Sequence, residues 1–249
     1  MTSAPATGDV NMAFDEALMR WSARSGDAVF RVYAWSSPTL SLGRNQRARG
    51  LYDVRAARSS GIGIVRRPTG GRALLHHREV TYCACLPADD AAAARAAYDF
   101  INGVLLAGLS SLGAPVSLAR DAAALPPGPR PCFDVPSAHE IVVDGRKLVG
   151  SAQWRHGGAL LQHGSILLHD DQSLIATLML APEGSPVAAT LADALGREPA
   201  IDEVAVALRD ALCRRSGSAP AAYAPDDVLL DEVDRLSGGY RDDDWTWRR

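Results

Sequence analysis

The sequence predicts an α+β fold whose sheets are largely antiparallel or mixed and are flanked by helices. Helical and strand patterns mix along 249 residues without an internal repeat. A long apolar segment at 91–113 has the spacing of a buried helix, and an Asp-Gly pair between apolar segments at 139–155 is typical of a hairpin. These three observations favour antiparallel strands packed against helices.

The first quarter of the chain predicts two helices and two strands. The segment at 11–24 has apolar residues at helical spacing, with Asp15 and Glu16 in an early turn. Ser-Ser-Pro separates two short β-like segments, and Gly61 ends a short helical one. The expected elements are strands at 29–35 and 39–43 and a helix at 53–61.

The middle of the chain centres on a glycine-containing loop and a hairpin. Residues 63–86 predict two strands around the Gly70-Gly71 pair, and the helix at 91–113 ends at a glycine. A proline-rich connector at 121–131 leads to Cys132. The hairpin at 139–155 follows, and 159–168 predicts a third strand of the same meander. Further helices, including 201–215, precede a polar and aromatic C-terminus.

Composition limits the classes of function. A net charge of −3 and a pI near 6.1 give no general electrostatic reason to expect nucleic acid or an anionic membrane as a partner. No charged and apolar leader and no stretch of roughly 18 apolar residues is present. We therefore expect a soluble, cytoplasmic protein. Four irregularly spaced cysteines predict reduced thiols.

The segment 66–72, RRPTGGR, is the first candidate for chemistry. Paired glycines let a backbone approach a ligand closely, and arginines suit phosphate or carboxylate. The segment matches neither a P-loop nor a dinucleotide-binding motif. A Gly-Gly pair between two strands more often forms a simple turn than a binding site. His76 and His77 are consecutive, so on a strand they point to opposite faces and one faces solvent. Both are more readily structural than catalytic.

The cysteines divide into two kinds. Cys83 and Cys85 lie two apart on an apolar strand, share a face and are predicted to be buried hydrophobic residues rather than a metal pair. No HxxxH or CxxC spacing supports zinc, so no metal is expected. Cys132 instead opens a segment with Asp134, His139 and Lys147. A nearby cation or base would favour its thiolate.

Lys147 is the one lysine among 26 lysines and arginines. Arginine stays protonated, whereas lysine is a compact cation whose charge can be tuned. Its position fifteen residues after Cys132 predicts that the two residues share a reacting site. Chance retention of a surface lysine is the alternative.

Five segments, taken in order, resemble a known family: NMAFDEALM, PTLSLGRNQ, RRPTGGRALLHHREVTY, DGRKLVGSAQ and ALLQHGSILL. Together they are similar to the biotin/lipoate protein ligase superfamily, in its lipoate and octanoate branch. The resemblance covers about 11–168 and less of 169–249. It implies one catalytic domain over 1–249. GGRA with PCFDVPS is similar to the cysteine-dependent octanoyltransferases and their amidotransferase relatives.

The resemblance implies a reaction and a set of residues. Octanoyl-acyl carrier protein would acylate Cys132, and a lysine of a lipoyl domain, such as that of glycine cleavage H protein, would accept the octanoyl group. Lys147 would hold the thiolate or polarise the acyl carbonyl, while Arg44, Arg66, Arg67 and Arg72 would dock acidic protein substrates. No cofactor and no ATP are expected. The implied substrate-binding residues are Arg67, Thr69, Gly70, Gly71, Arg72, Ala73, His76, Gly150, Ser151, Ala152, His163 and Gly164.

Three other functions remain open from the sequence. Amidotransfer of a lipoyl or octanoyl group between lipoyl domains would use the same cysteine with another donor. An ATP-dependent lipoate-protein ligase is disfavoured, because such ligases typically carry a third glycine after Gly-Gly, a His-Asp pair and an Asn-Asp pair. This chain has Arg72, His76-His77 and CFD there. A non-enzymatic cofactor-binding module would fit an inert Cys132.

Overall fold

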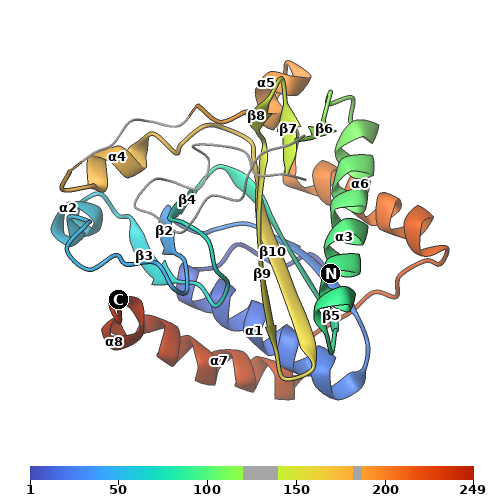
Figure 1. Cartoon of the computed structure of the whole chain (residues 1–249), viewed down its shortest axis with the longest axis horizontal. Helices are drawn as coiled ribbons and strands as arrows, with labels where there is room; N and C mark the ends of the chain where they lie inside the picture. Colours follow the sequence, from blue (N-terminus) through green and yellow to red (C-terminus); the bar gives the residue numbers. More distant parts are fainter. Residues whose placement is uncertain (120–139, 182–186) are drawn as a thin grey trace.

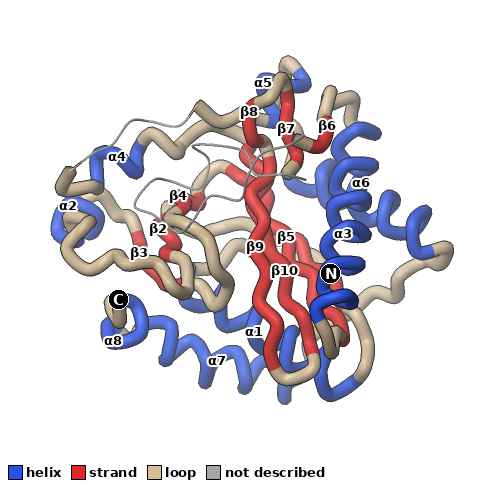
Figure 2. Tube along the Cα trace, in the orientation of Figure 1, coloured by secondary structure: helices blue, strands red, loops and turns tan. Residues whose placement is uncertain are grey.

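A four-stranded antiparallel sheet forms the centre of the protein in the computed structural model (Figures 1 and 2), which describes residues 1–119, 140–181 and 187–249. Its strand order is β1-β5-β10-β9. Helices α1 and α7 pack against one face, and α3 and α6 lie on the other. Two three-stranded sheets flank it, in the orders β3-β2-β4 and β6-β7-β8. The α+β class predicted from the sequence is confirmed.

The described helices follow the predicted apolar segments. They are α1 (Gly8–Ser25), α2 (Val54–Ser59), α3 (Ala91–Ser111), α4 (Leu174–Leu178), α5 (Leu191–Leu195), α6 (Ile201–Ser216), α7 (Asp227–Arg241) and α8 (Asp243–Thr246). The ends have local causes: Asp90 accepts a hydrogen bond from the Ala93 amide at the start of α3, and Gly26 takes a left-handed conformation after α1. Within the described residues, no helix is long and apolar enough to cross a membrane.

The described strands are short except for three in the central sheet. They are β1 (Val29–Tyr33), β2 (Thr39–Leu42), β3 (Gly63–Arg66), β4 (Leu74–His76), β5 (Glu79–Pro87), β6 (Ser117–Leu118), β7 (Ile141–Val143), β8 (Arg146–Lys147), β9 (Val149–His156) and β10 (Ala159–Leu167). The β3-β2-β4 sheet is mixed, because β2 pairs in parallel with β3 and antiparallel with β4.

Strand β5 is buried on both faces, which explains why its sequence is an apolar run. Val80 and Tyr82 belong to the core beneath α3, whereas Cys83 and Cys85 belong to the core beneath α1. The two thiols are fully buried with their sulfur atoms 3.6 Å apart. Burial raises the pKa of Cys83 well above the usual thiol value. The prediction that they are buried hydrophobic residues is confirmed.

The segment 63–86 forms three strands, so the prediction of two was too few. The chain leaves β3, passes through the Gly70-Gly71 loop and forms the short β4, so the predicted second strand is in fact two strands. A turn at 77–78 then starts β5 in a different sheet. The loop presses closely on β2: a Cβ on Gly43 would lie 1.9 Å from the Gly71 carbonyl oxygen. This contact fixes the loop against the end of β2.

Two hairpins occupy the predicted meander. Asp144 and Gly145 both have positive φ, as a tight hairpin turn requires, and join β7 to β8. Gly157 and Gly158 do the same between β9 and β10. The prediction of one meander was wrong in its pairing, because β10 pairs with β9 and β5 whereas β7 and β8 belong to another sheet. The chain changes sheets at Leu148.

The C-terminal segment packs against the start of the chain. Helix α7 lies along α1, where the Tyr240 hydroxyl donates to Glu16 at 2.5 Å. Beyond it, Arg66 Nε donates to the Thr246 carbonyl, and the Trp245 indole donates to the Arg66 carbonyl, both at 2.8 Å. The last residues therefore hold β3 at the start of the Gly70-Gly71 loop.

Candidate active site

A small cavity lies on the α1 face of the central sheet. Tyr33, Thr81, Ser165 and Gly150 are direct cross-strand neighbours on β1, β5, β10 and β9, so this row crosses the whole sheet on one face. Met12 from α1 lines the cavity opposite the sheet. The remaining lining residues are Arg67, Gly71, Leu74, His76, Ser151, Ala152, His163 and Gly164.

The cavity has an enclosed end and an exposed end. Met12 and Tyr33 are 1% and 0% exposed. Gly71 is exposed, and Ser151 and Ala152 are half-buried. The cavity therefore opens beside the glycine loop and β9 and closes beneath α1.

Glycine is required at position 164 by the packing of the cavity wall. A Cβ there would lie 2.5 Å from the Gly150 carbonyl oxygen and 2.7 Å from the Tyr82 ring. Both distances are shorter than the contacts that Cβ atoms make in proteins, so any side chain at this position would push β9 or β5 away. The clash with Tyr82 lies on the α3 face, so glycine at this position lets β5, β10 and β9 pack closely behind the cavity.

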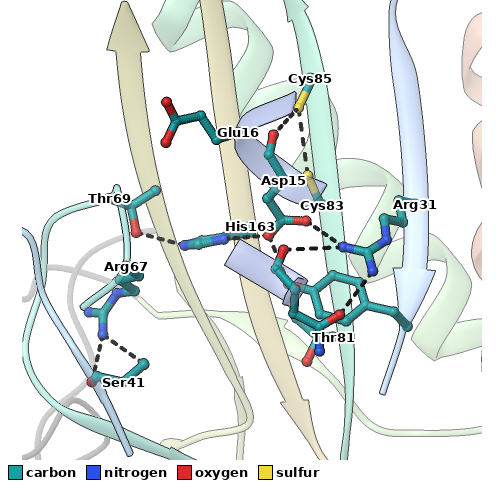
Figure 3. A network of polar contacts seen from close by, with 12 residues as sticks. Asp15, Glu16, Arg31, Ser41, Arg67, Thr69, Thr81, Cys83, Cys85 and His163 are labelled. Atoms are coloured by element: carbon teal, nitrogen blue, oxygen red, sulfur yellow. Dashed lines mark hydrogen bonds and ion pairs between the residues drawn. The ribbon is translucent and has the colours of Figure 1, made fainter. Parts of the chain in front are cut away.

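A carboxylate–histidine–hydroxyl chain supports one side of the cavity (Figure 3). Asp15 Oδ2 lies 2.9 Å from His163 Nδ1, and His163 Nε2 lies 2.6 Å from the Thr69 hydroxyl. Arg31 donates to Asp15 Oδ1 at 2.8 Å and the Tyr33 hydroxyl donates to Oδ2 at 2.8 Å. All of these side chains are buried. The chain ties α1 to β10 and to the glycine loop.

Electrostatics determine the protonation states in this chain. Burial opposes ionisation of Asp15, but its hydrogen bond to His163 and the Arg31 charge outweigh burial and lower its pKa. Burial also lowers the pKa of His163 despite the neighbouring carboxylate. Asp15 is therefore ionised and His163 neutral, with Nδ1 donating to Asp15. His163 Nε2 then accepts from Thr69.

A second chain of the same kind lies beside the first. His76 Nδ1 is 2.8 Å from Glu79 Oε1 and Nε2 is 2.7 Å from the Ser41 hydroxyl. Ser165 and Thr81 also donate to Glu79 Oε1, at 2.7 and 2.6 Å. The Trp35 ring stacks on the His76 ring with centroids 3.9 Å apart. His76 is thus fixed on all sides.

Arg67 holds the glycine loop in shape. Its guanidinium donates to the Gly70 carbonyl at 2.8 Å, the Arg72 carbonyl at 2.7 Å and the Ser41 hydroxyl at 3.0 Å. Gly71 has φ +93°, and a Cβ there would lie 2.7 Å from Arg67 Nη2. The loop conformation therefore requires glycine at position 71.

The cavity presents an apolar interior although many of its lining residues are polar. The polar atoms of Tyr33, Thr81, Ser165, His76 and His163 bond to carboxylates or to hydroxyls within the wall. They have little hydrogen-bonding capacity left for a ligand, whereas Met12 and Leu74 add apolar surface. The arrangement suits a hydrocarbon chain better than a polar molecule.

Lys147 lies on β8, three residues before the cavity-lining Gly150. Its side chain is 3% exposed, and Nζ lies 2.7 Å from Glu140 Oε1. It does not line the cavity among the described contacts. A compact buried ammonium is the kind of group that can polarise a carbonyl, so the short sequence distance to Gly150 keeps Lys147 a candidate.

The predicted substrate-binding residues divide into two groups. The structure brings together eight of them as cavity lining: Arg67, Gly71, His76, Gly150, Ser151, Ala152, His163 and Gly164. Thr69 contacts His163, Gly70 and Arg72 hold the loop through Arg67, and Ala73 is buried in the core beside β2. Cys132, with Asp134 and His139, lies outside the described residues, so its pairing with Lys147 stays a prediction.

The predicted docking surface is partly wrong. Arg66 is 0% exposed and donates to the Gly43, Gln46 and Thr246 carbonyls, and Arg67 is 4% exposed. Burial, followed by the charges of neighbouring arginines, lowers the pKa of Arg66 to about 10. Both are structural residues. Arg44 and Arg72 are partly exposed and remain candidates.

The two histidines behave as the alternation rule predicts. His76 is buried and lines the cavity, whereas the side chain of His77 is 39% exposed and lies 3.2 Å from Asp171. The sequence interpretation missed Asp15, Arg31, Tyr33 and Met12. Asp15 on an apolar helix face and Arg31 inside VFRVYAW were the available signals, because a charge among apolar residues requires a buried partner.

The chain combines its α+β fold with an apolar cavity beside the glycine loop. The model of the lipoyl protein ligase A/B catalytic domain matches residues 7–213. The chain belongs to this family.

Two curated relatives are octanoyltransferases named LipM. That of Kyrpidia tusciae is 36% identical over 261 residues, covering 96% of this chain and 94% of its own. That of Symbiobacterium thermophilum is 42% identical over 207 residues, or 76% of each chain.

Solved structures agree on the fold. A lipoate-protein ligase A bound with ATP has a TM-score of 0.83 at 20% identity, with 99% of this chain and 97% of that chain covered. The putative lipoate protein ligase of T. acidophilum, with bound lipoic acid, has a TM-score of 0.81 at 20% identity, with 99% and 98% covered.

Proposed function

We propose that the protein moves an octanoyl group from octanoyl-acyl carrier protein, through a thioester on Cys132, to a lysine of a lipoyl domain. Octanoyl transfer in protein lipoylation is the activity of its LipM relatives, which match most of the chain. The observation that carries the proposal is the apolar cavity that opens beside the glycine loop and β9. We place the reaction in the cytoplasm.

The proposed first step forms the acyl-enzyme. The Cys132 thiolate attacks the donor thioester carbonyl, and the carrier sulfur leaves and takes up a proton. One thioester replaces another, so the energies of the two states are similar. Lys147 stabilises the negative charge that develops on the carbonyl oxygen, and the hydrocarbon chain lies in the cavity.

The proposed second step forms the product. The acceptor amine, once deprotonated, attacks the acyl-enzyme carbonyl and displaces the Cys132 sulfur, leaving an amide. An amide is more stable than a thioester, so the transfer proceeds without ATP. No cofactor is part of the proposed reaction. The remaining partly exposed arginines, Arg44 and Arg72, are proposed to contact acidic surfaces of the two protein substrates.

One experiment separates this function from its alternatives. The enzyme is incubated with octanoyl-acyl carrier protein in the absence of ATP, and intact mass and peptide mapping are recorded before and after hydroxylamine. An octanoyl increment on Cys132 that hydroxylamine removes is the expected result. Acylation that requires ATP and free octanoate would contradict it and identify a ligase.

A second arm of the experiment tests the acceptor and the donor. The purified acyl-enzyme is mixed with an unmodified lipoyl domain, and amide formation on the lysine of that domain is followed by mass. In parallel, the free enzyme is offered an octanoylated lipoyl domain in place of octanoyl-acyl carrier protein. An enzyme that is acylated by an octanoylated lipoyl domain but not by the carrier protein would be an amidotransferase, contrary to the proposed donor.

A further inference from the structure

We propose that Met12, seated beside Tyr33, sets the length of acyl chain that the enzyme accepts. This inference rests on the proposed function. It concerns the enclosed end of the cavity, where a terminal methyl group would come to lie, and therefore selects among saturated acyl groups rather than between classes of ligand.

The row of cross-strand neighbours gives the cavity a direction. Gly150 on β9 comes first, next to the half-buried Ser151 at the open end, followed by Ser165 on β10, Thr81 on β5 and Tyr33 on β1. Strands lie ~4.8 Å apart, so the row spans about 14 Å from β9 to β1. A chain that enters beside β9 advances toward Tyr33.

The length of an octanoyl group matches this path. Its seven carbon–carbon bonds of ~1.5 Å cannot span more than about 10 Å. A carbonyl placed beside Gly150 therefore puts the terminal methyl group above β5, short of β1. Met12 and Tyr33, which are 1% and 0% exposed, close the cavity there.

The two closing residues differ in rigidity. The Tyr33 hydroxyl donates to Asp15, and the Arg31 guanidinium, which also bonds Asp15, lies 3.9 Å from the Tyr33 ring centroid. Tyr33 is therefore held by a buried ion pair. Met12 is an unbranched thioether that fills space by dispersion contacts alone, so a substitution there alters volume without leaving a polar group unpaired.

The chain offers a matched control at Met19. It lies seven residues further along α1, is 1% exposed, and belongs to the same apolar core, but it does not line the cavity. Met12→Ala and Met19→Ala both remove one buried methionine side chain from one helix. The two variants differ in whether the new space joins the cavity.

The test is a competition between carriers loaded with octanoyl and decanoyl groups at equal concentration. The ratio of the two acyl-enzyme masses after brief mixing gives the ratio of specificity constants. A pocket discriminates one methylene by roughly 10–200-fold. We expect Met12→Ala to shift the ratio toward decanoyl by at least about tenfold, while Met19→Ala keeps the parent ratio.

A converse variant strengthens the test. Met12→Phe, a bulkier residue, should shift competition between hexanoyl and octanoyl donors toward hexanoyl. Should Met12→Ala lose the native circular dichroism spectrum, Met12→Val carries the same expectation with a smaller shift. An unchanged ratio in folded Met12 variants, or an equal shift in Met19→Ala, overturns the inference. A parent enzyme that accepts no acyl carrier overturns the proposed function itself.

Discussion

His163 on β10 and Asp15 on α1 are 148 residues apart in sequence, yet their side chains lie 2.9 Å apart in the wall of the cavity. The carboxylate holds the Nδ1 proton, so the opposite nitrogen accepts from Thr69 in the glycine loop. One buried pair thus links a helix, the central sheet and the loop that borders the ligand.

This pair predicts a pH-dependent contribution to stability. The pKa of His163 is lowered in the folded chain, so at mildly acidic pH the unfolded chain binds a proton at this histidine and the folded chain does not. Its stabilising contribution is present above the unfolded value of ~6.5 and is lost as pH falls below it. We expect the Tm difference between the parent and His163→Gln to shrink from pH 7.5 toward 5. Thermal unfolding monitored by circular dichroism measures it.

The lowered pKa of Asp15 acts in the same direction at still lower pH, because its contribution is lost as pH falls through its folded value. His156→Gln removes an exposed histidine and is the control. Equal pH slopes for the parent and His163→Gln would show that His163 is not held neutral.

Lys147→Arg is expected to be damaging although it conserves charge. Lys147 is 3% exposed and its ammonium lies 2.7 Å from Glu140, whereas guanidinium is wider and stays protonated. We expect a normal fold and an acylation rate of Cys132 reduced on the order of a hundredfold, the lower range for loss of one group that stabilises charge on the carbonyl oxygen. Single-turnover adduct formation, followed by mass, measures this rate.

Arg146→Lys provides a comparison on the same short strand, where the side chain is exposed. A Lys147→Arg rate within about twofold of the parent, against the expected loss of about a hundredfold, would mean that the reaction does not need an ammonium at this position.

Cys132→Ser should abolish most of the transfer, because a hydroxyl is a far poorer nucleophile than a thiolate at neutral pH. The expected phenotype is a folded protein that forms no hydroxylamine-sensitive adduct. Cys83→Ala and Cys213→Ala are controls, one buried and one half-buried, and should retain the adduct. Near-normal turnover by Cys132→Ser would rule out covalent catalysis by this residue.

Gly71→Val should obstruct the open end of the cavity. The residue has φ +93°, and its Cβ would meet Arg67 Nη2 at 2.7 Å, so the loop must change shape. The strain is of order 1–3 kcal/mol, and we expect a raised KM for the octanoyl donor. Gly26→Val is matched, with φ +78° and open space around its Cβ. Equal donor KM values for both variants would contradict the assignment of the cavity mouth.

Local signals in the sequence were enough to predict most elements. The Asp144-Gly145 turn, the apolar helix at α3 and the buried face of Cys83 and Cys85 depend on residues close in sequence. The separation of β7 and β8 from β9 could not be predicted in this way, because pairing β10 with β5 joins segments about 80 residues apart. Sheet membership was decided by tertiary packing.

The same limit applied to the site. The resemblance supplied the glycine loop and the strand residues that line the cavity. It did not supply the buried ion pair of Asp15 and Arg31, because that pair joins α1 to β1 and forms only when the two elements pack together. Arg66 and Arg67 show a second reason. They are consecutive and chemically identical, and only strand geometry sends one to the C-terminal segment and the other to the glycine loop.

The hydrogen bonds between Arg66 and residues 245–246 have a consequence for biosynthesis. Domains begin to fold while they are being translated, from the N-terminal side. Strand β3 emerges early together with the Gly43 and Gln46 carbonyls, but the Thr246 carbonyl that accepts from Arg66 Nε is made about 180 residues later. A nascent chain can therefore form β3 and the glycine loop first, and the contacts that anchor β3 through Arg66 are complete only once α8 has been made.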